Sequence, residues 1–152
     1  MSRLFLATSF SGHVDYETGL VNSDYRHKIE FILASLRANG EFTVFCAVEE
    51  EGWTIKADVL PEVGVKLDLK EIDKCDMFLA LLPPDLISAG LQTEVGYAHA
   101  NGKQVVLATE NGSKLGLGYF NEGLAKLDGV AHIEYESPDE LANFVRKQCT
   151  NK

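Results

Sequence analysis

Five short runs of apolar residues recur along the chain, and within each run the apolar positions are continuous rather than alternating with polar ones. Such runs are typical of strands that are buried on both faces of a parallel sheet. The longer segments between them leave room for a helix after each strand, as in a series of βαβ units. The five predicted strands are residues 4–7, 42–47, 77–82, 104–108 and 130–135.

Amphipathic segments with helix-start and helix-stop residues separate these runs. Ser23 is placed to cap the first helix, and Asn39-Gly40 is a typical stop signal at its end. Ser137 opens a capping box with proline at the first helical position. Four helices are predicted, beginning near Ser23, Pro61, Gly90 and Ser137. The second of them should bury an apolar face that consists of Val65, Leu67, Leu69 and Ile72.

This alternation predicts one α/β domain over residues 1–152, doubly wound in the flavodoxin or Rossmann manner, with a five-stranded parallel sheet flanked by helices. Three loops, residues 9–22, 48–58 and 83–89, follow the first three strands. Ligands of such sheets bind beyond the carboxyl ends of the strands. The functional site is therefore expected where these three loops meet.

Composition narrows the classes of partner. The 152 residues carry a net charge of −9, which repels nucleic acid and anionic membranes but leaves a small anionic ligand possible. No apolar stretch is long enough to span a bilayer and the amino-terminal run is too short for a signal peptide, so a cytoplasmic location is expected. The three cysteines and four histidines lack metal-ligand spacing, and no metal site is predicted.

Glu94 is the strongest candidate for chemistry. It lies one turn into the third predicted helix, after Ser88-x-Gly90. Backbone amides in the first turn of a helix, together with a serine hydroxyl, can cradle an anion, and Gly90 allows a ligand to approach the backbone closely. We expect the helix dipole to keep Glu94 ionised, as a nucleophile toward an oxocarbenium-like sugar must be. From spacing alone, an ordinary helix-start glutamate is the more frequent explanation.

The loop residues allow ordinary alternatives as well. Phe10 can stack on a base or simply pack in the loop, and Trp53 can cover the base or bury its edge. Glu51 can face a base amino group or belong to a solvated run of glutamates. The candidates for binding phosphate or sugar oxygens, which also look like common turn residues, are Ser9, Ser11 and Gly12.

The motif Ser-x-Gly-x-x-x-Glu-x-Gly-x-Ala, here residues 88–98, resembles that of the nucleoside 2-deoxyribosyltransferase superfamily. The resemblance implies that Glu94 is the nucleophile and that Asp68 contacts the nucleoside and assists departure of the base. Ser88 stands where transferases of free nucleosides tend to have an acidic residue. In having serine at this position the chain resembles the branch that hydrolyses nucleoside 5′-monophosphates, in which that serine contacts the phosphate.

Within that branch, residues 3–108 resemble the CMP and hydroxymethyl-CMP hydrolases. Two positions depart from the family pattern. Phe5 stands where many relatives have a tyrosine that positions the nucleophile, and Ser11 replaces an arginine that can grip base or phosphate. The resemblance also implies a homodimer or higher homo-oligomer with shared sites, in which Asn121 reaches into a neighbouring subunit.

The sequence therefore predicts hydrolysis of the N-glycosidic bond of a nucleoside 5′-monophosphate, with a leaning toward pyrimidines and without a cofactor. Two alternatives stay open. A deoxyribosyltransferase would pass the sugar to a second base instead of water. A non-catalytic module would use the same fold only to bind a nucleotide.

Overall fold

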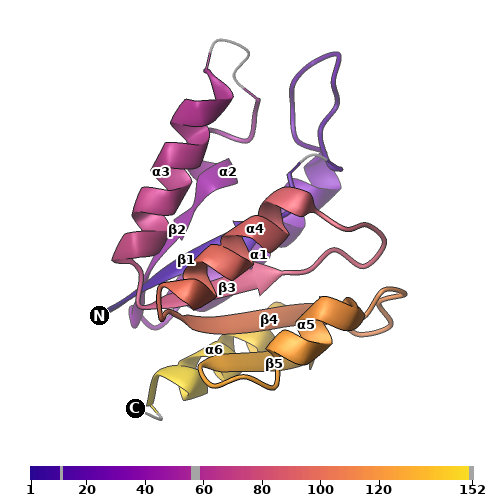
Figure 1. The fold of residues 1–152 in the computed structure, drawn as a ribbon. Coiled ribbons are helices and arrows are strands. Elements are labelled where there is room, and N and C mark those ends of the chain that lie inside the picture. Colours follow the sequence, from indigo (N-terminus) through magenta and orange to yellow (C-terminus); the bar gives the residue numbers. More distant parts are fainter. Residues whose placement is uncertain (11, 56–58, 151–152) are drawn as a thin grey trace.

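The computed structural model describes residues 1–10, 12–55 and 59–150, and within them five strands form one sheet in which all neighbouring strands are parallel (Figure 1). The strand order is β2-β1-β3-β4-β5, the order of flavodoxin-like doubly wound sheets. This confirms the predicted fold class. The strands are β1 (Ser2–Thr8), β2 (Phe42–Cys46), β3 (Met77–Leu81), β4 (Gln104–Glu110) and β5 (Val130–Tyr135).

Helices cover both faces of the sheet (Figure 1). Helices α1 and α6 lie on one face, whereas α3, α4 and α5 lie on the other. The helices are α1 (Ser23–Arg37), α2 (Ala47–Glu50), α3 (Pro61–Lys74), α4 (Ala89–Ala100), α5 (Gly118–Leu124) and α6 (Pro138–Thr150). None of the helices in the described ranges is long and apolar enough to cross a lipid bilayer.

The core is divided in two by the sheet, because successive side chains of a strand point to opposite faces. In β1, Leu4 and Leu6 join the cluster under α1 and α6, whereas Phe5 and Ala7 join the cluster under α3, α4 and α5. All four are at most 2% exposed. Burial on both faces explains why the strands appear in the sequence as continuous apolar runs.

The helix starts are set by side-chain caps, and one differs from the prediction. Asn22, not Ser23, caps α1, since its side-chain oxygen accepts hydrogen bonds from the amides of Asp24 and Tyr25. An acceptor must stand just outside the helix to reach these amides, and Ser23 is already helical. The capping interaction expected at the last helix is present, with Ser137 Oγ accepting from the amide of Glu140 at 3.2 Å.

Two short helices and one helix face depart from the prediction. The segment after β2, predicted as a loop, begins with α2, and α5 was not predicted. Of the apolar face expected on α3, only Ile72 is buried, while Val65 and Leu67 are 56% and 43% exposed. The amino-terminal half of α3 extends past the sheet (Figure 1), so its apolar side chains have no core beneath them.

The chain reverses its direction of winding between β1 and β3, which pair from Leu4 with Met77 to Thr8 with Leu81. From β1 the chain returns to the edge strand β2, and from β3 it continues the other way to β4. The loops that leave β1 and β3 therefore diverge at their carboxyl ends. A crevice at such a point is the usual ligand site of this architecture.

Candidate active site

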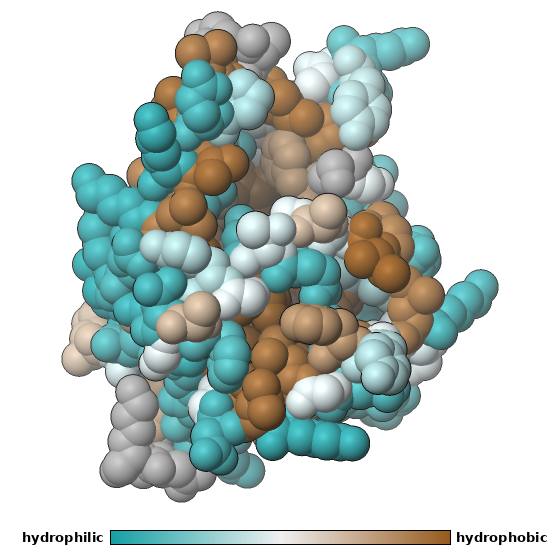
Figure 2. All heavy atoms as spheres, in the orientation of Figure 1, coloured by the Kyte–Doolittle hydropathy of each residue, from teal (hydrophilic) through white to brown (hydrophobic). Residues whose placement is uncertain are grey.

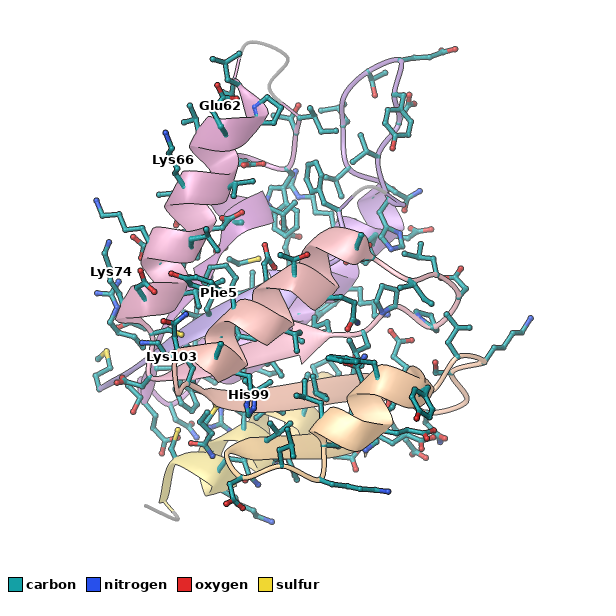
Figure 3. The ribbon with its side chains drawn as sticks, in the orientation of Figure 1. Phe5, Glu62, Lys66, Lys74, His99 and Lys103 are labelled. Carbon is teal, nitrogen blue, oxygen red and sulfur yellow. The ribbon has the colours of Figure 1, made fainter. Side chains whose placement is uncertain are left out.

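A cavity of about 170 Å³ lies at this crevice, bounded by the end of β1, by α2 and by the facing sides of α3 and α4. Figure 3 shows Phe5 in the space between α3 and α4, and Figure 2 shows that the molecule is hollowed on this side. Drug-sized ligands usually occupy roughly 300–1,000 Å³, so this cavity suits one ring or one sugar rather than a dinucleotide. The lining residues are Phe5, Leu6, Ala7, Thr8, Phe10, Ala47, Val48, Glu51, Asp68 and Glu94.

Glu94 enters the cavity from the second turn of α4. Burial, and to a smaller extent the negative charge of Asp68, together raise the pKa of its carboxyl group to about 7. The expectation that the helix dipole holds Glu94 ionised is therefore wrong. The dipole acts mainly within the first turn of a helix, whereas desolvation penalises the charged form throughout the cavity.

Asp68 projects from α3 into the same cavity. Burial, and to a smaller extent the charge of Glu51 at the carboxyl end of α2, together raise its pKa to about 6. Asp68 thus interacts with Glu94 on one side and with Glu51 on the other. The three carboxyl groups come from α2, α3 and α4, which the fold brings to one crevice.

The charge of the cavity explains these shifts. Its described lining contains three acidic residues and no lysine, arginine or histidine, so no cation offsets the cost of ionising a carboxyl group there. The basic side chains of α3 that Figure 3 labels, Lys66 and Lys74, point away from the cavity. A pair of neighbouring carboxyl groups with raised pKa values can share one proton near neutral pH. Such a pair can supply a carboxylate and a carboxylic acid at the same time.

Ser88 and Gly90 begin α4, as the motif requires. Ser88 is the residue that caps the helix, and its Oγ accepts a hydrogen bond from the amide of Leu91 at 3.3 Å. A side chain at Gly90 would meet nothing within 4 Å, so the backbone there faces open space. Ser88 does not line the cavity of Glu94 but a separate groove beside it.

That groove has a volume of about 450 Å³ and lies between the β3–α4 loop and α5. Asn121 lines it together with Ser88; the asparagine is 5% exposed, and its side-chain nitrogen donates to the carbonyl of Leu117 at 3.1 Å. Its side-chain oxygen is buried without a hydrogen-bond partner among the described residues. The rim is apolar (Figure 2), with exposed Ile87, Leu115, Tyr119 and Phe120.

The β1–α1 loop supplies one wall of the cavity. Phe10 lines the cavity, whereas Ser9 is completely buried and its hydroxyl has no partner within the described part of the chain. Gly12 lies against the β3–α4 loop, since a Cβ there would come within 2.4 Å of Leu86 Cδ2. It lines a separate hollow within the β1–α1 loop, not the cavity. Ser11, also predicted to bind the substrate, lies outside the described residues.

Trp53 does not cover the cavity. It is 8% exposed, is packed in the core under α1 and is not part of the cavity lining. The guanidinium of Arg26 lies 5.3 Å from the centre of its ring. Its backbone has φ of 61°, a conformation that a bulky residue adopts only when the surrounding structure imposes it.

Within residues 1–10, 12–55 and 59–150, no group of three or more histidine, cysteine, aspartate or glutamate side chains is arranged to hold a metal ion. The carboxyl groups of Asp68 and Glu94 are thus the chemically distinctive feature of the cavity. An ionisable pair with shifted pKa values in a crevice is a frequent property of catalytic sites.

A family model described as nucleoside 2-deoxyribosyltransferase matches residues 21–141. The chain belongs to this family. The match includes α3 and α4, which carry Asp68 and Glu94, and confirms the resemblance seen in residues 88–98. No curated protein matches the chain.

Several solved structures share the fold of this nucleoside 2-deoxyribosyltransferase family member over nearly its whole length. BlsM is 27% identical, with 99% of this chain and 95% of that chain covered and a TM-score of 0.74. The CMP N-glycosidase BcmB of Clostridium botulinum is 24% identical, covering 96% and 98%, with a TM-score of 0.67. A 2-deoxyribosyltransferase of Bacillus psychrosaccharolyticus is 21% identical, covering 93% and 91%, with a TM-score of 0.61.

Some cavity residues of this family member had no signal in its sequence. Ala47 and Val48 line the cavity because α2 turns the chain back toward β1, and a short helix of four residues leaves no periodic pattern. Thr8 ends β1 and could have been found from its position at the carboxyl end of a strand. Phe5 lies in the lining, so this position offers Glu94 no hydroxyl.

Proposed function

We propose that this protein hydrolyses the N-glycosidic bond of a nucleoside 5′-monophosphate, with a preference for pyrimidine bases. The observation that carries the proposal is the pair Glu94 and Asp68, which face one small cavity and whose pKa values burial raises to about 7 and about 6. Membership of the nucleoside 2-deoxyribosyltransferase family supports a reaction at a glycosidic carbon. The fold shared with a CMP N-glycosidase supports a nucleotide substrate.

The proposed reaction has two displacements. In the first, the Glu94 carboxylate attacks C1′ and the bond from C1′ to the base nitrogen breaks. The electron pair of that bond stays on the base, which takes a proton from Asp68. In the second, water attacks C1′ and releases Glu94 while Asp68 accepts the proton of the water. The products are the free base and ribose 5-phosphate or its deoxy form, with retained configuration and without a cofactor.

The amino terminus of α4 is the proposed phosphate site. Its first-turn amides point out of the helix, the backbone at Gly90 is open, and Ser88 stands at the cap. Ser11 stays a proposed contact of the phosphate or sugar, whereas Ser9 is completely buried and Gly12 lines a different hollow, so neither of these two is proposed to contact the substrate. Since the cavity holds only about one ring, the base would fill it with C1′ next to Glu94, and the rest of the sugar and the phosphate would extend from it toward Ser88 and Gly90.

The proposed base site is the part of the cavity between Phe10 and Glu51. The ring of Phe10 offers a face for stacking, and the carboxylate of Glu51 accepts hydrogen bonds from amino groups. A small cavity also favours a single ring over a purine. These features support the preference for pyrimidines.

A second candidate is a deoxyribosyltransferase, which uses the same Glu94 intermediate but gives the sugar to a second base. The description of the family and the fold shared with a 2-deoxyribosyltransferase favour this candidate. Incubation with a deoxynucleoside and a different free base separates the two, because only the transferase forms a new nucleoside. A third candidate is a module that binds a nucleotide without turning it over. Phe5 keeps this candidate open, because phenylalanine offers no hydroxyl near Glu94.

We also propose that the protein is a cytoplasmic homodimer or higher homo-oligomer whose subunits share active sites. The groove beside Ser88 supports this, because Ile87, Tyr119 and Phe120 are 79%, 95% and 68% exposed around it. Large exposed apolar side chains gathered at one place mark a contact surface. Asn121 lines this groove, close to the proposed phosphate site. The mass of the protein in solution, with and without Tyr119→Asp, measures the oligomeric state.

The decisive experiment is a screen of the common ribo- and deoxyribonucleoside monophosphates for release of free base by chromatography. We expect base release from pyrimidine nucleotides by the wild type, and loss of nearly all of it in Glu94→Ala. Glu62→Gln is a matched control, since Glu62 points away from the cavity on α3 (Figure 3). Base release that survives in Glu94→Ala would contradict the proposed nucleophile.

A further inference from the structure

The segment that carries Ser9 and Phe10 leaves β1 without regular structure of its own, yet Phe10 must hold a fixed place to form a cavity wall. The nearest fixed point is Tyr25 in the first turn of α1. Its hydroxyl donates a hydrogen bond of 2.8 Å to the carbonyl oxygen of Ser9. The bond spans 16 positions of the chain and ties the start of the loop to the helix that follows it.

His13 adds a second attachment to the same side chain. Its ring is stacked on that of Tyr25, with ring centres 3.6 Å apart and planes inclined by 7°. The amide of His13 donates to the carbonyl of Phe10 at 3.1 Å, and its carbonyl accepts from the amide of Asn22 at 2.8 Å. His13 therefore connects Phe10, the end of the loop and α1 at one point.

The loop so attached is joined to the opposite wall of the site. The amide of Val21 donates to the carbonyl of Trp53 at 3.0 Å, and Leu20 forms an antiparallel bridge with Thr54. Trp53 is held in its unfavourable backbone conformation within this junction. Glu51 lies shortly before Trp53 in the chain. The attachment of the loop to Tyr25 therefore affects the position of both walls between which the base is proposed to bind, the one with Phe10 and the one with Glu51.

We propose that Tyr25 and His13 are positioning residues, which fix the β1–α1 loop so that Phe10 stands ready beside the substrate ring. The inference rests on the proposed function, in which Phe10 contacts the base. Neither residue lines the cavity, so their effect reaches the substrate through Phe10. A wall that is ordered before binding spares the substrate the entropic cost of ordering it.

The surroundings of His13 favour a neutral ring. Burial lowers its pKa, Asp85 of the β3–α4 loop acts in the opposite direction, and Lys28 of α1 lowers it further. Lys28 is itself ion-paired with Glu110 at the end of β4. Above pH 7 the contact with Tyr25 is therefore a stack of two uncharged rings.

The test compares Tyr25→Phe, His13→Ala and His13→Phe with the wild type, using CMP as substrate. Tyr25→Phe keeps the stacked ring but removes the hydrogen bond to Ser9, and His13→Phe keeps a stack without the imidazole. We expect a roughly three- to tenfold rise in KM for Tyr25→Phe and His13→Ala with kcat changed less than about twofold. His13→Phe should restore KM to near the wild-type value. The matched control is His27→Ala, because His27 is an exposed histidine on α1, the helix that carries Tyr25. This variant should leave KM unchanged.

Hydrogen exchange gives a readout that does not depend on turnover. The amides of His13 and Asn22 should exchange faster in Tyr25→Phe and His13→Ala than in the wild type, while amides of β3 keep their protection. Unchanged exchange in the loop would overturn the inference, as would unchanged KM in both variants. If the wild type does not cleave CMP but the loop amides exchange faster in the two variants, the proposed function fails while the attachment of the loop stands.

Discussion

At the scale of single residues, the decisive relation is the one between the two carboxyl groups of the cavity. Glu94 must be ionised to attack C1′, whereas Asp68 must carry a proton to protonate the base. Their pKa values, about 7 and about 6, lie close together, and each group is influenced by its neighbours. The pair carries one proton most often between these two values, and the reactive form is the arrangement of the pair with that proton on Asp68. Because Glu94 has the higher pKa, this arrangement is the less populated of the two.

This predicts a bell-shaped dependence of kcat/KM on pH in the wild type, with its maximum between about 6 and about 7. Asp68→Asn should lower the rate by roughly 10²- to 10⁴-fold, because the acid is lost. The fall of the rate at high pH should disappear with it. The remaining rise should report the pKa of Glu94 without the charge of Asp68, which lies below about 7 but is still raised by burial.

Steady-state rates between pH 4.5 and 9 measure this. Glu50→Gln, a change of an exposed glutamate on α2, serves as the control and should keep the wild-type profile. An Asp68→Asn profile that still falls at high pH would show that another group supplies the proton.

The sequence predicted which residues lie together in the site, but it did not predict how buried or how charged their surroundings are. Glu94 and Asp68 were found from the motif and from its distance along the chain, and Phe10 from its place after a strand. The ionisation of Glu94 was misjudged because it depends on side chains from β1, α2 and α3, which no local pattern describes. For Trp53 the sequence left burial and covering of the base equally open, and contact with the core under α1 accounts for its burial.

At the scale of elements, the strands were predicted well and the helix boundaries less well. Strands buried on both faces leave a strong signal, and all five lie where the apolar runs predicted them. The short helices α2 and α5 have four and seven residues, too few for a periodic pattern to distinguish them from loops. The start of α1 was misplaced by one residue, since Asn22 and Ser23 are both good caps by type.

Which of the two residues caps α1 can be tested by mutating each of them separately. Asn22→Ala removes the acceptor for two amides in the first turn of α1 and should lower the free energy of unfolding by about 1 kcal/mol. Ser23→Ala should change it much less, because Ser23 already has helical geometry. Thermal melting measures both, and a shift of about 2–4 °C is expected for a domain of this size. An equal loss in the two variants would contradict the assignment of the cap.

At the scale of the whole molecule, the fold gathers acidic residues at a place where it also partly buries them. The net charge of −9 is otherwise spread over exposed side chains, where solvent screens it. In the cavity the described lining offers no basic partner, so ionised Glu94 opposes folding. A site of this kind is maintained at a cost in stability, which the sheet and its two core clusters offset.

The cost depends on pH, and its direction follows from the pKa of Glu94, which burial raises from its usual 4.5 to about 7. Below pH 4.5 the group is protonated in both the folded and the unfolded chain, so folding carries no penalty. Between about pH 4.5 and about pH 7 the unfolded chain ionises while the folded chain keeps the proton, so stability is lost over this interval and the loss is complete above about pH 7. Glu94→Gln removes this loss. It should therefore leave the free energy of unfolding unchanged at pH 4 and raise it by about 3 kcal/mol at pH 8. Denaturant unfolding at the two pH values measures the difference, with Glu62→Gln as the exposed control. A gain of equal size at both pH values would mean that packing, and not the buried charge, accounts for the effect.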